Sequence, residues 1–109
     1  MVATTDELKE SISDFIALLK PHIRVDAAVL YGSYAHGTPH EDSDIDLAII
    51  SPDFEGMNIS ERQRILSRLT FQRRDRRVEA MGYPSSEYHS PGRHSFLREI
   101  IATGRKVYP

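Results

Sequence analysis

The stretch GSYAHGTPHEDSDID occupies residues 32–46 and carries the pattern from which the fold is inferred. In it Gly32-Ser33 is followed, after ten intervening residues, by Asp44-Ile45-Asp46. Glycine lets an anion approach the backbone closely, and serine adds a hydroxyl and an amide as donors. Two aspartates one residue apart offer oxygen ligands of the kind that hard divalent cations prefer. The spacing therefore indicates a phosphate cradle and a metal site in one place.

Short elements lead into and out of Gly32-Ser33. Residues 27–31 form a continuous apolar run that ends at the glycine, as expected of a buried strand that delivers the motif to a turn. Residues 34–37 could form one helical turn, whose backbone amides would point at a bound anion. Residues 38–43 are polar and include a proline and two acids, which predicts a loop. We therefore expect the phosphate-binding residues at the end of a strand.

Two further strands are predicted over residues 44–50 and 78–84. In the first of them, the alternation of a β-strand places Asp44 and Asp46 on the same face, so that both carboxylates point the same way. The later strand is closed by a proline, and its single carboxylate is Glu79. Glu79 is therefore the candidate for a third acid beside the two aspartates.

Capping boxes predict the starts of two helices, and they are formed by Thr4 with Glu7 and by Ser60 with Gln63. The first helix carries an apolar stripe up to Pro21, and the second is expected to reach about Arg73. Residues 51–56 and 84–92 are expected to be loops. A final helix begins near Phe96 and stops at Gly104, and the short tail after it could form an edge strand. The expected order is helix, strand, strand, helix, strand, helix.

Length and composition limit the functions that need to be considered. The chain has 109 residues, enough for one compact domain over residues 1–109 but too few for separate catalytic and acceptor-binding domains. A formal net charge of −2 argues against general nucleic-acid binding. Because the chain has no cysteine, no signal-peptide pattern and no stretch of membrane-spanning length, we expect a cytoplasmic protein with no membrane partner.

The spaced pattern resembles the signature of the nucleotidyltransferase superfamily related to the palm of DNA polymerase beta, which here consists of Gly32, Ser33, Asp44 and Asp46. The resemblance covers nearly the whole chain, through the run SDIDL to a closing helix that ends in GRKVY, and it is similar to the minimal nucleotidyltransferase (MNT) branch. It implies an α/β fold in which helices flank a small mixed β-sheet. It also implies that the two aspartates bind metal, and Glu79 matches the third acid by position.

The reaction implied by this resemblance is in-line attack of an acceptor hydroxyl on the α-phosphate of a nucleoside triphosphate, with pyrophosphate leaving. Two Mg²⁺ ions would divide the chemistry, bound by Asp44, Asp46 and Glu79 and by the phosphates. Glu79 could also accept the proton of the hydroxyl. The implied nucleotide-binding residues are Gly32, Ser33 and His36. Many relatives carry arginine in place of His36, so a permanent cation beside the phosphates is missing here.

The acceptor is expected to be a separate molecule, because a chain this short has little left to build an acceptor pocket. In the resembled branch, small single-domain members act as antitoxins of a helical HEPN-type toxin, which implies ATP as donor and a partner protein as acceptor. Two alternatives stay open. One is transfer to a small molecule such as an aminoglycoside, with a homo-oligomer completing the pocket. The other is a binding antitoxin or regulatory subunit without catalysis.

The segment 62–77 contains seven arginines and one aspartate. Such a segment could face RNA, an acidic partner or nucleotide phosphates, or could simply form the solvated side of an amphipathic helix. Arg64 and Arg68 lie opposite the apolar stripe, as in an ordinary amphipathic helix, and no aromatic residues are interleaved for stacking on bases. The remaining histidines, including His40, lack a metal-ligand spacing and are expected on the polar surface.

Overall fold

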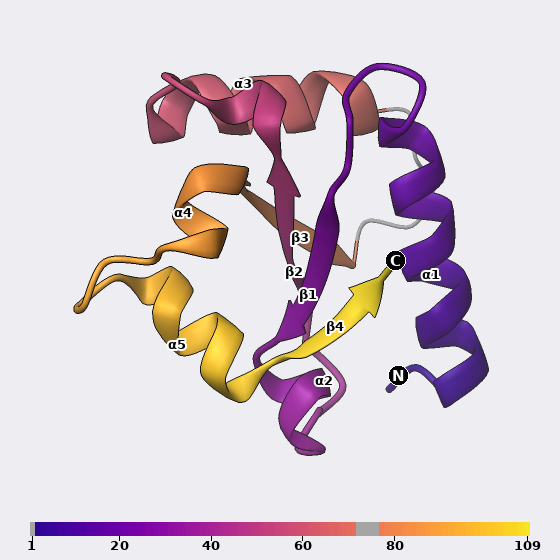
Figure 1. Cartoon of the computed structure of the whole chain (residues 1–109). Coiled ribbons are helices and arrows are strands. Elements are labelled where there is room, and N and C mark those ends of the chain that lie inside the picture. The colour runs from indigo at the N-terminus through magenta and orange to yellow at the C-terminus, as the bar shows by residue number, and fades with distance from the viewer. Residues whose placement is uncertain (1, 72–76) are drawn as a thin grey trace.

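The computed structural model describes residues 2–71 and 77–109 and has a mixed α/β fold (Figure 1). The strands are β1 (Ala27–Tyr31), β2 (Ile45–Ser51), β3 (Val78–Pro84) and β4 (Arg105–Tyr108). The helices are α1 (Thr5–Leu19), α2 (Ser33–His36), α3 (Ile59–Thr70), α4 (Ser85–His89) and α5 (Phe96–Thr103), with a 3₁₀ turn, η1 (Pro52–Phe54), after β2. The predicted order of the longer elements is confirmed.

The four strands form one mixed sheet in the order β3-β2-β1-β4. Strand β1 is antiparallel to both β2 and β4, whereas β2 and β3 are parallel. The parallel pair needs a crossover connection, and α3 lies within it. The expected small mixed sheet flanked by helices is therefore confirmed, as is the edge strand predicted for the tail.

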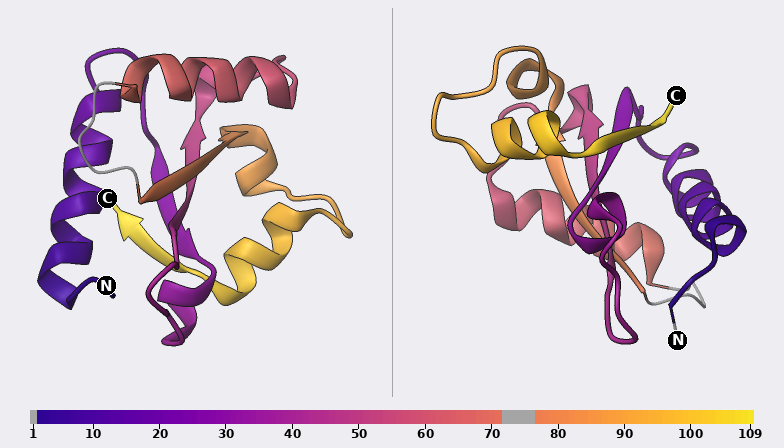
Figure 2. Two further views of the ribbon diagram at one scale, coloured as in Figure 1. Left: turned by 180° about the vertical axis from the view of Figure 1, so that it is seen from behind. Right: turned by 90° about the horizontal axis from the view of Figure 1, so that it is seen from below.

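Helices cover the sheet on both faces, as the view from below in Figure 2 shows. Helices α1 and α3 pack on one face, and their buried residues share a core cluster with Leu30, Leu47 and Ile49 of the sheet. On the other face α5 packs through Leu97 and Ile100 against alternate residues of β1 and β2. Because successive side chains of a strand point to opposite faces, the same two strands supply both cores.

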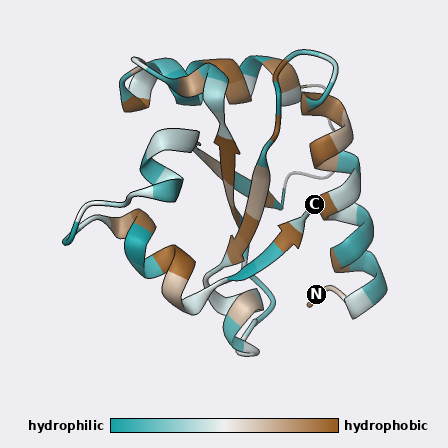
Figure 3. Cartoon of the chain, viewed as in Figure 1, coloured by the Kyte–Doolittle hydropathy of each residue, from teal (hydrophilic) through white to brown (hydrophobic). Residues whose placement is uncertain are grey.

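The centre of the sheet is apolar, and Figure 3 shows the hydrophobic colour concentrated on β1 and β2. Side chains of these strands that are completely buried include Leu30, Ile45, Leu47 and Ile49. Full burial of such a side chain contributes roughly 1.5–3 kcal/mol to folding. Helix α1 buries its predicted stripe against them and starts at the predicted capping box of Thr4 and Glu7. The apolar pattern of the sequence therefore accounts for the inner layer of the fold.

The predicted capping box of α3 is wrong by two residues. The side chain of Asn58 accepts a hydrogen bond from the Glu61 N–H at 2.9 Å, and the Glu61 carboxylate accepts one from the Asn58 N–H at 3.2 Å. Gln63, the expected partner of Ser60, instead donates its side-chain amide to the carbonyl of Ala80 at 2.9 Å. Gln63, which was expected to cap α3, thus contacts β3 instead.

Four other features also differ from the expected ones. Helix α3 ends at Thr70 rather than near Arg73, which lies outside the described residues. The expected loop over residues 84–92 contains α4, and the expected loop over 51–56 contains η1. Strand β2 begins at Ile45, so Asp44 lies just before the strand and not within it.

The arginines of segment 62–77 do not share one role. Arg62 is buried, and its guanidinium donates to the carbonyls of Met57 at 3.0 Å and Gly82 at 3.1 Å. Arg64 and Arg68 are exposed on α3, in agreement with an amphipathic helix. The arginines at positions 73, 74 and 76 lie outside the described residues. Arg62 therefore holds α3 to β3 and is not part of a basic surface.

Candidate active site

Gly32 joins β1 to α2 in a conformation that requires glycine. Its backbone has φ 75° and ψ −157°, a region that residues with side chains rarely enter. A Cβ atom at this position would also overlap Oδ2 of Asp46. The turn continues into α2, where the N–H groups of Ala35 and His36 each donate to the Gly32 carbonyl at 3.1 Å. The glycine and the aspartate of the predicted motif are therefore in direct proximity.

The strand pairing places three polar side chains in a row at one end of the sheet. Tyr31, the last residue of β1, pairs with Asp46 in the antiparallel ladder, and Asp46 pairs with Glu79 in the parallel ladder. Paired residues project from the same face of a sheet with Cβ atoms roughly 5 Å apart. The end of β1 and the starts of β2 and β3 thus bring Asp46 and Glu79 together on the face covered in part by α4 and α5.

Asp44 is held next to this row by the loop before β2. The Ser43 hydroxyl accepts a hydrogen bond from the His40 N–H at 2.8 Å, and the Ser43 N–H donates to the His40 carbonyl at 3.0 Å. The Ile45 N–H donates to the carbonyl of Arg77, which ties this loop to the start of β3. His40 and Ser43 were not expected to shape the site, although a Ser near a turn is a known signal for such local bonds.

The electrostatics of the row favour a bound cation. Burial raises the pKa of the Asp46 carboxyl, and the neighbouring Asp44 and Glu79 raise it further. Burial raises the pKa of Tyr31 to about 12, and smaller contributions come from Asp46, Tyr83 and Glu79. Negative charge is therefore disfavoured at this end of the sheet, as expected where carboxylates repel one another. A positive ion would relieve this repulsion.

The donor set fits an open site for a hard divalent cation rather than a complete cage. Among residues 2–71 and 77–109, no group of three or more His, Asp or Glu side chains is gathered closely enough to hold a metal ion by itself. Asp46 nevertheless pairs with Glu79, and Asp44 is near enough to raise the pKa of Asp46. Mg²⁺ in nucleotide enzymes takes few protein oxygens and completes its shell with water and phosphate. The residues present are compatible with that arrangement.

His36 lies at the end of α2 beside a small cavity of about 170 Å³. The cavity is bounded by Tyr31 and Gly32 on one side and by α5 on the other, where Phe96 is 52% exposed. The rings of Tyr31 and Phe96 meet edge to face with centroids 5.7 Å apart. The structure thus places His36 next to Gly32, and it adds an aromatic wall that the sequence pattern did not indicate.

A second contact that sequence reasoning missed connects α2 to the residues before α1 and β3. The buried Tyr34 hydroxyl accepts hydrogen bonds from the Arg77 guanidinium at 2.6 Å and from the Ala3 N–H at 3.0 Å. Arg77 directly precedes β3, so this bond links the helical turn after Ser33 to the strand that carries Glu79. The pair is separated by 43 residues, and no local sequence signal predicts it.

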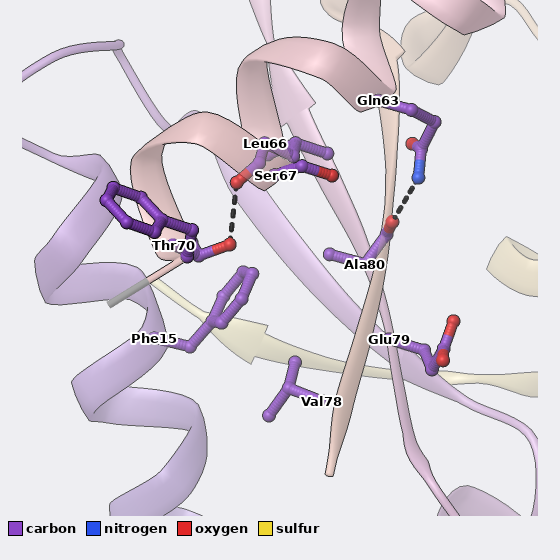
Figure 4. Close-up of a pocket in the computed structure, with 9 residues that line it drawn as sticks. Phe15, Gln63, Leu66, Ser67, Thr70, Val78, Glu79 and Ala80 are labelled. Carbon is purple, nitrogen blue, oxygen red and sulfur yellow. Dashed lines mark hydrogen bonds between the residues drawn. The ribbon is translucent and has the colours of Figure 1, made fainter. Parts of the chain in front are cut away.

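A larger cavity, of about 370 Å³, lies on the other face of the sheet between α1, α3 and β3 (Figure 4). Its wall combines apolar side chains, such as Phe15 and Val78, with polar ones, such as Gln63 and Thr70. Glu79 also borders it, but Figure 4 shows its carboxylate pointing away from Phe15 and Val78. This cavity is therefore separate from the row of carboxylates.

Comparison with known proteins finds one matching family. The family described as "Polymerase beta, Nucleotidyltransferase" matches residues 13–109. A search among curated proteins gave no match. In the described residues, no helix is both long and apolar enough to cross a membrane.

Solved structures resemble the chain at low sequence identity. A toxin-antitoxin structure with AMP-PNP is 26% identical, covers 92% of this chain and 72% of its own, and has a TM-score of 0.53. The toxin-antitoxin MntA-HpeT, in a mutant with two aspartates two positions apart changed to glutamate, is 22% identical with the same coverage and a TM-score of 0.57. A Sulfolobus solfataricus protein provisionally named a nucleotidyltransferase is 22% identical over 74% of this chain and 67% of its own, with a TM-score of 0.54. The chain belongs to the polymerase beta nucleotidyltransferase family.

Proposed function

We propose that the chain is a metal-dependent nucleotidyltransferase that transfers AMP from ATP to a hydroxyl group of a partner protein, and that it acts in this way as the antitoxin of a HEPN-type toxin. The observation that carries the proposal is the meeting of Gly32, Asp46 and Glu79 at one end of the sheet. Family membership supports nucleotidyl transfer.

The residues divide the reaction between binding and proton transfer. Gly32 leaves room at the turn, and Ser33 binds the terminal phosphates through its hydroxyl and its amide. Asp44, Asp46 and Glu79 would hold Mg²⁺, which when bound neutralises phosphate charge and lowers the pKa of the acceptor hydroxyl.

In the transfer step, the acceptor oxygen forms a bond to the α-phosphorus while the bond to pyrophosphate breaks, and pyrophosphate leaves with the electron pair. The hydroxyl proton passes to the Glu79 carboxylate.

The assignment of the partner rests on the similar structures. Two of them are toxin-antitoxin assemblies, one containing AMP-PNP, which is an analogue of ATP. In the MntA-HpeT mutant the two altered aspartates have the same spacing as Asp44 and Asp46. These features support ATP as donor, a toxin as acceptor and the aspartates as essential groups. A small-molecule acceptor and a purely binding antitoxin are the competing functions.

One labelling experiment separates these functions. The purified chain is incubated with Mg²⁺ and ATP labelled in the α-phosphate, with the protein encoded beside it or with an aminoglycoside. We expect label on the neighbouring protein, and no label when Mg²⁺ is removed by EDTA. Asp44→Asn and Asp46→Asn should abolish labelling, whereas Asp14→Asn, an exposed position on α1, should retain it. Label on the aminoglycoside, or tight binding without label, would support the competing functions instead.

A further inference from the structure

The small cavity beside His36, of about 170 Å³, adjoins the candidate active site. Tyr31 and Gly32 form its wall on the sheet side. Both lie next to Asp46, because Tyr31 pairs with it across the ladder and a Cβ atom on Gly32 would overlap its carboxylate. The opposite wall is helix α5, and Figure 1 shows the later part of this helix beside α2. A ligand held at Gly32 and Asp46 can therefore extend into this cavity.

Helix α5 presents one stripe of side chains to the cavity. The residues at this helical spacing are Phe96, Glu99, Ile100 and Thr103. Ile100 is buried in the core, whereas the other three are exposed. Beside an apolar base, the stripe thus offers a ligand an aromatic ring, a carboxylate and a hydroxyl.

The ring of Phe96 is held in place although it is 52% exposed. It meets the Tyr31 ring edge to face, with centroids 5.7 Å apart. The preceding Ser95 caps α5, because its hydroxyl accepts a hydrogen bond from the Arg98 N–H at 3.2 Å and donates one to the Gly92 carbonyl at 3.0 Å. These contacts position the ring and leave about half of it exposed. Such a ring is a platform on which a nucleobase can stack.

The polar groups of the stripe are hydrogen-bond acceptors. The Thr103 hydroxyl donates its proton to the Glu99 carbonyl at 2.9 Å, so its oxygen is left to accept. Among residues 2–71 and 77–109, no cation forms an ion pair with the Glu99 carboxylate. A carboxylate repels phosphate, so this wall is unsuited to the triphosphate itself. It suits a ligand edge with N–H donors, such as the amino group of adenine.

We propose that the cavity between α2 and α5 is the subsite for the nucleobase of the donor nucleotide. The base stacks on Phe96, and its amino group donates a hydrogen bond to the Glu99 carboxylate. The cavity is smaller than the roughly 300–1,000 Å³ of pockets that enclose a whole ligand, which fits a subsite for one part of a nucleotide. The subsite rests on the proposed function, because the triphosphate bound beside Gly32 brings the base to it.

Nucleotide binding in the absence of a partner protein tests the role of Phe96. Isothermal titration calorimetry of the full chain with Mg²⁺ compares ATP with inorganic tripolyphosphate, which carries the phosphates but no nucleoside. Phe96→Ala should weaken ATP binding about tenfold, a typical loss for a stacked base, and should leave tripolyphosphate binding unchanged. Phe96→Tyr retains a ring and should bind ATP as the native chain does. Ile59→Ala, which shortens a side chain that is 62% exposed on α3, is the matched control and should also bind ATP normally.

The role of Glu99 is tested with purine riboside triphosphate, which keeps the stacking ring but lacks the amino group of adenine. The native chain should bind ATP about tenfold more tightly than this analogue, because the analogue cannot donate the hydrogen bond to the carboxylate. Glu99→Ala should bind the two ligands equally. Glu10→Ala, which removes an exposed acid of α1, should keep the native preference.

The outcomes separate this subsite from the proposed function. Unchanged ATP binding by Phe96→Ala, or a native chain that binds ATP no more tightly than tripolyphosphate, would remove the subsite and leave the transfer reaction standing. Equal losses of ATP and tripolyphosphate binding would assign Phe96 to the support of the phosphate-binding turn instead. A preference for ATP that persists in Glu99→Ala would overturn the contact with the amino group. A native chain that binds none of these ligands would contradict the proposed function as well as the subsite.

Discussion

On one face of the sheet, Leu30, Ile45 and Leu47 are completely buried beneath α1 and α3, whereas the same end of the other face presents Tyr31, Asp46 and Glu79. Within one strand, Asp46 thus belongs to a cluster of carboxylates, and its neighbour Leu47 belongs to an apolar core. This contrast shows how a small sheet can combine both roles. Alternation separates the two environments. We call the face under α1 and α3 the closed face, and the end of the other face that carries Tyr31, Asp46 and Glu79 the open face. The apolar cores contribute stability, which the crowded carboxylates of the open face reduce.

The largest expected effect on stability is at Leu47, on the closed face. Because this side chain is 0% exposed, Leu47→Ala should leave a cavity and lower the free energy of unfolding by about 3 kcal/mol. Urea denaturation followed by circular dichroism measures this change. Ile101→Ala, at a position 37% exposed, should cost less than about 1 kcal/mol. Similar losses for the two variants would contradict the burial of Leu47 beneath α1 and α3.

Substitutions on the open face should change the transfer activity rather than the stability. Glu79 is exposed, so Glu79→Gln should leave the melting temperature nearly unchanged. If Glu79 holds the metal and accepts the proton, the rate of label transfer should fall about 100-fold, a typical contribution of a general base. Glu41→Gln, which alters an exposed acid of the loop before β2, is the control and should keep full activity. A fully active Glu79→Gln protein would remove this residue from the site.

Gly32 lies in a turn of the fold and beside the carboxylate of Asp46, so a side chain there should affect both stability and transfer activity. Gly32→Ala combines an unfavourable backbone conformation with overlap of the Asp46 carboxylate, and we expect a loss of about 2 kcal/mol in stability together with loss of transfer. Gly37 has a similar φ of 73°, but a Cβ there meets nothing within 4 Å. Gly37→Ala should therefore cost about 1 kcal/mol and preserve transfer. Equal behaviour of the two variants would show that the contact with Asp46 is unimportant.

The sequence predicts the strands that carry the candidate site better than it predicts the starts and ends of the surrounding helices. The apolar runs were enough to place Gly32 at the end of one strand and Asp46 within another, because those rules depend only on neighbours along the chain. The pairing of Asp46 with Glu79 is seen only in the structure. The start of α3 was misplaced because Asn58 with Glu61 and Ser60 with Gln63 are both plausible caps. The contact of Gln63 with β3 is a tertiary one, and local spacing contains no information about it.

The same limit applies to the supports of the site. Tyr34 and Arg77 meet across 43 residues, and Arg62 reaches Gly82 across 20 residues. In the sequence these arginines look like parts of one basic segment. Their separate structural contacts follow from the parallel pairing of β2 with β3, which fixes where segment 62–77 returns to the sheet. Counting arginines therefore overestimates the basic surface, because some of their side chains form hydrogen bonds within the fold.

The smallest expected effect is a gain in stability from removing a charge on the open face. Burial, with Asp44 and Glu79 nearby, raises the pKa of Asp46 in the folded chain above its ordinary value. The ionised form is then less favourable in the folded than in the unfolded chain, which lowers stability at pH values above the folded pKa. Asp46→Asn removes this penalty. Because water screens a partly exposed carboxylate, we expect a gain of ~0.5 kcal/mol, or about 2–4 °C in melting temperature, at pH 7.5 in EDTA.

The sign of this effect should depend on pH and on metal. As the pH falls through the raised pKa of Asp46 toward 3.8, the native carboxyl becomes protonated and the advantage of Asp46→Asn should vanish. With excess Mg²⁺ and ATP at pH 7.5, ligand binding stabilises the native chain and not the variant, so the order of the two melting temperatures should reverse. If the variant were less stable than the native chain in EDTA at pH 7.5, Asp46 would contribute to folding through its charge. The carboxylates would then belong to the scaffold, and the separation of roles between the two faces would fail.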